Sequence, residues 1–299
     1  MAQRGNTARF YIPFIFYPFI KAFAMESFVR DHYHAKNLLD KIDAGLTAAG
    51  KDPKQIDIRD LAPVDQLHTG GIRGTTALLE QLDIPAGFHV LDAGCGLGGT
   101  CRVMAKTCGC DVTGIDLSPD YIEAARVLTH RTGLAERIQF KAGSILALPD
   151  VIGPFDLILC QHILMNISDK QAAIQQFVRH LKPKGKIILH EIVAGSHPEL
   201  ALPVPWAASA DISFLEPWET LLAGFTDNGF TLETFIDATA IGTRYWQKAK
   251  EFALKNADVP RALGPHLVFG DMAARFPFTM SQNFETRAVK LVEAVLTRH

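Results

Sequence analysis

The chain has 299 residues, of which 48% are hydrophobic and 21% are charged. This composition excludes an intrinsically disordered chain and a collagen-like repeat, and the length suits one α/β domain with added segments. The formal net charge is −2. Because the overall basic excess that is typical of nucleic-acid-binding proteins is absent, we expect small-molecule partners and no nucleic acid.

Cysteine usage indicates a reducing compartment. The five cysteines include no C-x-x-C pair, and an odd number cannot pair completely within one chain. We therefore expect free thiols in a cytoplasmic protein. We expect no metal site, since Cys108 and Cys110 offer too few ligands at too close a spacing for zinc.

An aromatic run, F-Y-I-P-F-I-F-Y-P-F-I, covers residues 10–20. It is shorter than the ~18 apolar residues of a transmembrane helix. Pro13 and Pro18 would break the apolar helix of a secretory signal. We therefore expect residues 1–30 to form an aromatic arm without stable membrane insertion. The arm would pack over the body, over the mouth of a site, or against a second copy in a homo-oligomer.

Residues 31–84 are predicted to form a helical cap. In L-L-D-K-I-D-A-G-L the apolar residues lie three to four positions apart, which predicts a helix that ends near Gly50. A second short helix is expected over residues 74–82. Between them, D-Q-L-H-T-G-G at residues 65–71 has the composition of a polar, glycine-rich loop.

Strands and helices alternate from His89 onward, which predicts parallel strands joined by right-handed crossovers, with helices on both faces of a doubly wound sheet. Strands are expected at residues 90–92, 112–116, 138–141, 155–160, 186–193, 231–236 and 290–296. Helices are expected at residues 100–107, 119–131, 169–180 and 219–227, with Ser118 as an N-cap, a turn at 181–185 and helical additions at 239–282.

The sharpest signal is V-L-D-A-G-C-G-L-G-G at residues 90–99, a buried strand followed by a glycine-rich turn. Such a turn lies at the carboxyl edge of a parallel sheet, where ligands bind. The G-x-G-x-x-G spacing, with Asp116 twenty residues after Gly96, fits a dinucleotide or a nucleoside. Asp92 would repel a pyrophosphate and attract a cation. This favours S-adenosylmethionine, which carries a sulfonium and an ammonium, over NAD.

Five segments in order, V-L-D-A-G-C-G-L-G-G, G-I-D-L-S, A-G-S-I, F-D-L-I-L-C-Q-H and L-K-P-K-G-K-I-I-L, resemble the motifs of class I S-adenosylmethionine-dependent methyltransferases. D-Q-L-H-T-G-G, Q-H-I-L-M-N-I and P-V-P-W-A resemble the sarcosine/dimethylglycine-type small-molecule branch. The resemblance implies a Rossmann-like, mainly parallel seven-stranded sheet with an antiparallel last strand. It also implies that residues 85–299 form the cofactor-binding domain, with substrate-side insertions at 194–214 and 239–282.

The same resemblance implies roles for the cofactor-binding residues. Gly94 and Gly96 would contact the methionine end, Asp92 the ammonium and Asp116 the ribose. Many relatives carry an acidic residue where Ser144 stands, so adenine recognition would depend more on the backbone here. The complete expected set is Gln66, Asp92, Gly94, Gly96, Asp116, Leu117, Ser144, Ile145 and Gln161.

Methyl transfer needs an acceptor held in line with the cofactor's methyl group, and a base where the acceptor must lose a proton. His162, just after the fourth strand, is the first candidate base, and His68 in the cap loop is the second. An ordinary imidazole in this role would make turnover fall at acid pH. Asn166, Glu191 and Trp206 are candidate substrate contacts, and His190, Arg73 and Arg244 are weaker candidates.

Two alternatives to a methyltransferase stay open. An NAD-linked oxidoreductase would explain the glycine spacing and Asp116, but no tyrosine is followed four residues later by lysine. A non-catalytic cofactor-binding partner protein is the other alternative, and the intact glycines and the polar residues at the strand edge speak against it. The acceptor atom, whether nitrogen, oxygen or carbon, does not follow from the sequence.

Overall fold

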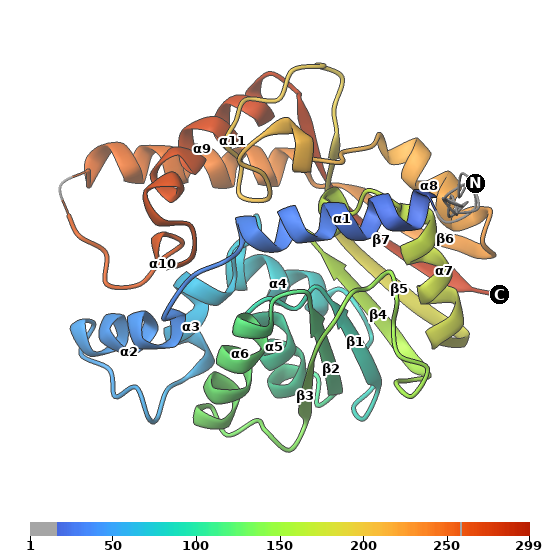
Figure 1. Ribbon diagram of the computed structural model, residues 1–299, viewed down its shortest axis with the longest axis horizontal. Helices are drawn as coiled ribbons and strands as arrows, with labels where there is room; N and C mark the ends of the chain where they lie inside the picture. Colours follow the sequence, from blue (N-terminus) through green and yellow to red (C-terminus); the bar gives the residue numbers. More distant parts are fainter. Residues whose placement is uncertain (1–16, 258) are drawn as a thin grey trace, which may run out of the picture.

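A computed structural model describes residues 17–257 and 259–299, with side chains from Met25 onward. A seven-stranded sheet has the order β3-β2-β1-β4-β5-β7-β6, and β7 runs antiparallel to both of its neighbours (Figure 1). The strands are β1 (His89–Ala93), β2 (Asp111–Asp116), β3 (Ile138–Ala142), β4 (Phe155–Gln161), β5 (Leu181–Ala194), β6 (Phe230–Asp237) and β7 (Val289–Arg298).

Helices cover both faces of this sheet. Val90 and Val112 pack with α4 (Gly71–Glu80), α5 (Gly99–Thr107) and α6 (Pro119–Arg131) in one buried cluster. Leu91 and Ile158 pack on the other face with α7 (Lys170–His180) and α8 (Trp218–Thr226). Neighbouring residues of β1 therefore face opposite helical layers, as the period of two in a strand requires. The predicted doubly wound fold is confirmed.

Local capping explains where the helices begin. The Ser118 side chain accepts a hydrogen bond from the backbone N–H of Tyr121, with Pro119 at the first helical position. Asp169 caps α7 in the same way by accepting from the N–H of Ala172. Both predicted helix starts are confirmed.

Two local predictions need correction. The predicted turn at residues 181–185 lies inside β5, where the register shifts and Lys184 has a φ of 62°, so its proline and glycine belong to an irregularity within the strand. Helix α3 (Ile58–Asp65) was not predicted as a separate helix. A capping box between Asp57 and Asp60 starts this helix, but Pro63 inside it obscures the pattern.

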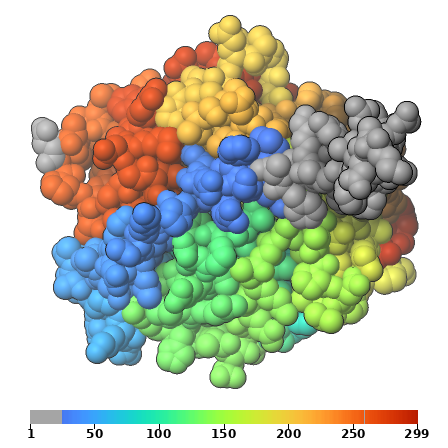
Figure 2. Space-filling model, viewed as in Figure 1, coloured from blue at the N-terminus to red at the C-terminus, as the bar shows by residue number. Residues whose placement is uncertain are grey.

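A third buried cluster joins N-terminal and C-terminal helices above the sheet. It combines residues of α1 (Tyr17–His32), α2 (Leu38–Ala48) and α3 with those of α9 (Thr239–Lys255), α10 (His266–Phe269) and α11 (Phe276–Glu285). The short 3-10 turns are η2 (Leu164–Asn166), η3 (Ala210–Ile212) and η4 (Gly270–Arg275). Figure 1 shows α1 lying between the sheet and the C-terminal helices, and Figure 2 shows its described residues in a band between them.

The predicted aromatic arm is described only in part. Residues 1–16 and the side chains up to Ala24 lie outside the described residues, which leaves most of the aromatic run without an account. The remaining part of the arm belongs to α1. Within the described ranges, no helix combines the length and apolar character needed to cross a bilayer.

Strand register places the predicted site residues together. Ala93 at the end of β1 pairs with Ile115 of β2 and with Cys160 of β4. The residues that follow these three positions are Gly94, Asp116 and Gln161, so all three lie at one edge of the sheet. The backbone N–H groups of Gly94 and Cys95 both donate to the carbonyl of Ile115, which fixes the glycine turn against β2.

Candidate functional site

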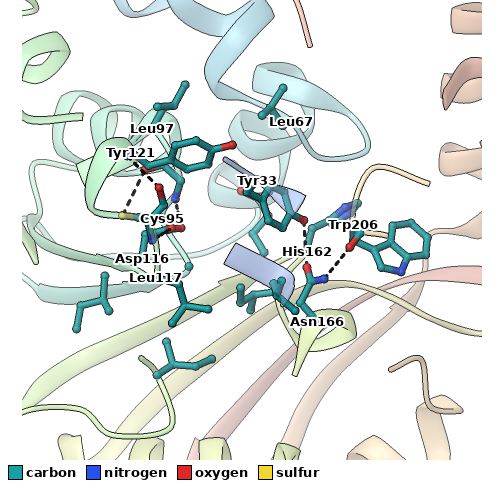
Figure 3. Close-up of a pocket in the computed structure, with 18 of the residues that line it drawn as sticks. Tyr33, Leu67, Cys95, Leu97, Asp116, Leu117, Tyr121, His162, Asn166 and Trp206 are labelled. Carbon is teal, nitrogen blue, oxygen red and sulfur yellow. Dashed lines mark hydrogen bonds between the residues drawn. The ribbon is translucent and has the colours of Figure 1, made fainter. Parts of the chain in front are cut away.

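A cavity opens at this carboxyl edge, beneath α1 (Figure 3). Two parts of its lining recur below. The turn end consists of Gly94, Gly96, Asp116, Leu117 and Ile145, and the histidine end of Tyr33, His162, Asn166 and Trp206. Figure 3 shows Asp116 and Leu117 on one side of the cavity and the four residues of the histidine end on the other.

The glycine turn leaves space for a ligand. Gly94 and Gly96 have φ values of 77° and 53°, a region that side chains other than glycine rarely adopt. A Cβ on Gly94 would lie 2.4 Å from Cδ1 of Ile163, but a Cβ on Gly96 would meet no atom within 4 Å. The backbone of Gly96 is therefore exposed to the cavity, as close approach of a ligand requires.

Asp116 ends β2 with both carboxylate oxygens engaged by backbone donors. Oδ2 accepts from the N–H of Gly96 at 2.9 Å, and Oδ1 accepts from the N–H of Ser118, also at 2.9 Å. Burial raises the pKa of Asp116, and these two hydrogen bonds oppose that effect. The carboxylate holds the glycine turn and the start of α6 together and keeps further lone pairs for donors in the cavity.

Asp92 lies under the turn with an exposed fraction of 2%. Its Oδ2 accepts a hydrogen bond from the Cys101 thiol at 3.0 Å. Burial is the main cause that raises the pKa of Asp92 to about 6, with a smaller contribution from the charge of Asp116. A cation in the cavity would favour the ionised form of this carboxylate.

A chain of polar side chains connects the cap loop to β4. Gln161 Oε1 accepts from the hydroxyl of Thr100 at 2.8 Å, and its amide lies 3.3 Å from the hydroxyl of Thr75. Thr75 in turn donates to Gln66 Oε1 at 3.1 Å and lies 3.0 Å from His68 Nε2. This network ties the loop at residues 66–70 to the carboxyl end of β4.

Three histidines meet at the histidine end. The rings of His162 and His190 stack with centroids 5.2 Å apart, and His68 packs edge-on at 5.9 Å from His162. Burial, together with these two neighbours, holds the pKa of His162 well below 6.5. Burial also lowers the pKa of His68 to about 3. Both His162 and His68 are therefore neutral at pH 7.

His162 differs from the other two histidines in its hydrogen bonding. His68 and His190 each have both ring nitrogens within 3.3 Å of oxygen atoms of the protein. His162 Nε2 is buried and has no partner among the described residues. Its backbone has a φ of 53°, and its N–H donates to the carbonyl of His190. An unpartnered nitrogen in the cavity lining can bond to a ligand.

Glu191 supports this turn from behind. Its carboxylate accepts hydrogen bonds from the backbone N–H groups of Ile163 and Leu164 at 3.1–3.2 Å. The side chain is fully buried, and burial raises its pKa to about 8 against the effect of those hydrogen bonds. Glu191 does not line the cavity. Glu191, predicted as a substrate contact, therefore lies behind the segment after His162 and holds its backbone N–H groups.

Asn166 and Trp206, the other two predicted substrate contacts, line the histidine end. The Tyr33 hydroxyl donates to Asn166 Oδ1 at 3.1 Å, and Asn166 Nδ2 donates to the backbone carbonyl of Trp206 at 2.8 Å (Figure 3). The Trp206 indole N–H donates to the Ser213 hydroxyl at 2.9 Å. These polar groups connect the end of α1 to the segment after β5.

Ser144 does not face the cavity. Its hydroxyl donates to the carboxylate of Glu26 on α1 and accepts from the N–H of Leu146. Glu26 itself lines the cavity beside Gly143 and Ile145, and burial raises its pKa. An acidic group is therefore present next to residue 144, but a different part of the chain supplies it.

Most of the predicted site residues share the cavity wall. Three do not line it, because their side chains bond elsewhere: Gln66, Ser144 and Glu191. The weaker candidates Arg73, His190 and Arg244 are also outside the lining. The prediction missed several lining residues, of which the clearest are Glu26, Tyr33, Tyr121 and Phe269. No group of three or more His, Cys, Asp or Glu side chains in the described part of the chain could hold a metal ion.

Comparison with known proteins identifies the central domain. The family model described as a methyltransferase domain matches residues 84–226. These residues are a methyltransferase domain. The methyltransferase domain contains β1 to β5 and the glycine turn, which confirms the family resemblance of the sequence motifs.

Curated relatives agree with this assignment. Phosphoethanolamine N-methyltransferase 3 of Arabidopsis thaliana is 36% identical over 123 residues, which cover 41% of this chain and 25% of the relative. Glycine/sarcosine/dimethylglycine N-methyltransferase of Actinopolyspora halophila is 30% identical over 132 residues, which cover 44% of this chain and 23% of the relative. The chain spans less than half of the length of these relatives.

Solved structures share the fold. Geranyl diphosphate C-methyltransferase of Streptomyces coelicolor A3(2), in complex with Mg²⁺, geranyl diphosphate and S-adenosyl-L-homocysteine, has a TM-score of 0.59 at 17% identity. The similarity covers 76% of this chain and 78% of that one, so it extends beyond the methyltransferase domain to added segments.

Proposed function

We propose that the protein transfers a methyl group from S-adenosylmethionine to a small-molecule acceptor. The observation that carries this proposal is the open backbone of Gly96 in a cavity that two carboxylates also line, the buried Asp92 and the partly buried Asp116. A cofactor with cationic groups and no phosphate suits that arrangement, whereas the pyrophosphate of NAD at the glycine turn would lie near the Asp92 carboxylate. The proposal also agrees with the methyltransferase domain at residues 84–226.

The residues of the cavity fit such a cofactor. Asp116 would accept hydrogen bonds from the ribose hydroxyls, and Asp92 would lie near the ammonium. Leu117 and Ile145 would pack against the adenine. When bound, the cofactor supplies an electrophilic methyl group. His162 would bond through Nε2 to the acceptor and hold its nucleophilic atom, and Gln161 and His68 would keep that end of the site in place.

Equilibrium binding and methyl transfer test this function. We expect calorimetry to show binding of S-adenosylmethionine and no binding of NAD. We also expect transfer of labelled methyl to a small molecule. Binding of S-adenosylmethionine without transfer to any acceptor of a broad panel would favour a non-catalytic cofactor-binding protein, and preferential binding of NAD would favour an oxidoreductase.

The Asp116→Ala variant should bind S-adenosylhomocysteine roughly ten- to hundredfold more weakly, because a hydrogen bond to a charged group contributes ~1.5–3 kcal/mol. The variant also leaves the N–H groups of Gly96 and Ser118 without their partner, so its melting temperature should fall. Asp111→Ala, at the exposed other end of β2, is the matched control. Equal affinities for the two variants in calorimetry would contradict the role of Asp116.

Glu26 is proposed to recognise the amine of the adenine in place of an acidic residue at position 144. We expect the wild-type protein to prefer S-adenosylhomocysteine over S-inosylhomocysteine, whose base carries a carbonyl there, by roughly tenfold. Glu26→Ala should abolish most of that preference. An unchanged preference in competition binding would exclude Glu26 from adenine recognition.

Two further proposals concern the cellular compartment and the oligomeric state of the protein. We infer a cytoplasmic protein, because all five cysteines are free in the structure. We also propose that the protein is a homo-oligomer, which sedimentation of the full chain tests: a monomer at micromolar concentration would exclude it.

A further inference from the structure

The histidine end of the cavity is mainly apolar and aromatic. Beside Tyr33 and Trp206, the cavity is lined by Val29 of α1, Met165 of η2 and Phe269 of α10. Phe269 lies 5.7 Å, centroid to centroid, from Tyr33. Such a surface favours an acceptor with a substantial apolar part, because binding would remove apolar surface of both the acceptor and the cavity from water.

The polar groups of this wall are already used within the protein. The Tyr33 hydroxyl, the Asn166 amide and the Trp206 indole N–H form the series of hydrogen bonds described above. A ligand with several polar groups would have to break these hydrogen bonds, or its own polar groups would stay without partners. Buried polar groups without hydrogen-bond partners are unfavourable. Three buried atoms of the lining residues have no partner in the described part of the chain: His162 Nε2, the Tyr121 hydroxyl oxygen and Asp65 Oδ1. Of these, His162 Nε2 is the one at the histidine end.

The charged groups around the cavity also disfavour a polar ligand that carries negative charge. Carboxylates of Glu26, Asp92 and Asp116 line it, and so does Asp65, whose charge is already paired with buried Arg102 at 2.7 Å, outside the lining. Among the described residues of the lining, Arg30 alone is a lysine or arginine, and its side chain is 52% exposed and lies 3.9 Å from Asp31. His68 and His162 are neutral at pH 7. A phosphate or carboxylate on the acceptor would therefore meet negative charge without a buried cation to pair with.

We propose that the methyl acceptor is a largely apolar molecule, neutral or cationic, that presents one amine or hydroxyl to His162 and carries no phosphate or carboxylate. This proposal rests on the proposed function, since it describes what the same cavity holds beside the cofactor. Substrates with anionic groups, such as phosphoethanolamine, would be excluded.

Two probes with the same ten-carbon chain and opposite charge test this class. Geranylamine and geranyl diphosphate are titrated into protein saturated with S-adenosylhomocysteine, which fills the turn end and leaves the histidine end open. We expect geranylamine to bind at least roughly tenfold more tightly, because like charges oppose the diphosphate. Equal or tighter binding of geranyl diphosphate, or no binding of geranylamine, would overturn the proposal.

A pair of variants locates the probe. Phe269→Ala should weaken geranylamine binding roughly fivefold or more, since it removes an aromatic contact at the histidine end. Phe252→Ala, at an exposed phenylalanine of α9, should leave it unchanged. Equal effects of the two would place geranylamine elsewhere and overturn the assignment. Binding of S-adenosylhomocysteine is measured first, so that its loss would count against the proposed function and not against the acceptor class.

Discussion

Gly96→Val is expected to lose S-adenosylmethionine binding while the sheet stays folded. The Cβ of residue 96 would meet no protein atom within 4 Å. The valine side chain would therefore point into the open space through which the cofactor approaches the backbone of residue 96. The φ of 53° adds strain of ~1–3 kcal/mol for a branched side chain. Calorimetry with S-adenosylmethionine and circular dichroism measure the two effects separately.

Gly87→Val is the matched control for backbone strain. Gly87 has a φ of 80°, an added Cβ there also meets nothing within 4 Å, and the residue lies in an exposed turn before β1. Both variants should lose comparable stability, but only Gly96→Val should lose the ligand. If both variants bind S-adenosylmethionine like the wild type, the glycine turn is structural and the proposed cofactor site is wrong.

The turn end of the site could be predicted from the sequence because its residues follow strands directly. Asp92, Gly94 and Asp116 stand at fixed positions relative to β1 and β2, and parallel strands bring their carboxyl ends to one edge. Local patterns therefore determined both the fold and this half of the site. Ser118 and Asp169 fixed helix starts in the same way, through hydrogen bonds within three residues.

The roof of the cavity could not be predicted, because its contacts are distant in the sequence. Glu26 bonds to Ser144 across 118 positions, and Tyr33 bonds to Asn166 across 133. Helix α1 has apolar residues around its whole circumference, so no face is marked as lining a site. Glu191 stood at the correct edge, but the sequence does not show that its carboxylate faces two backbone N–H groups.

His162→Gln should keep its affinity for S-adenosylhomocysteine and lose roughly 10²-fold or more in turnover. Glutamine keeps much of the size and polarity, but it lacks the imidazole nitrogen that would bond to the acceptor and take up its proton. His130→Gln, on the exposed side of α6, controls for the loss of any histidine. Turnover is measured with an apolar primary amine such as geranylamine as acceptor.

The pH profile of these two proteins distinguishes the environment seen in the structure from that of an ordinary imidazole. A free histidine with a pKa near 6.5 would be mostly charged at pH 6, so the advantage of wild type over His162→Gln would shrink there. Burial and the neighbouring rings of His68 and His190 hold the pKa of His162 well below 6.5, so the imidazole stays neutral from pH 8 to pH 6. The ratio of the two turnover rates should therefore stay constant over that range. This expectation replaces the fall in turnover at acid pH that the sequence predicted for an ordinary imidazole. A ratio that falls several-fold by pH 6 would show that His162 titrates as an exposed residue, and near-equal rates throughout would exclude His162 as the base.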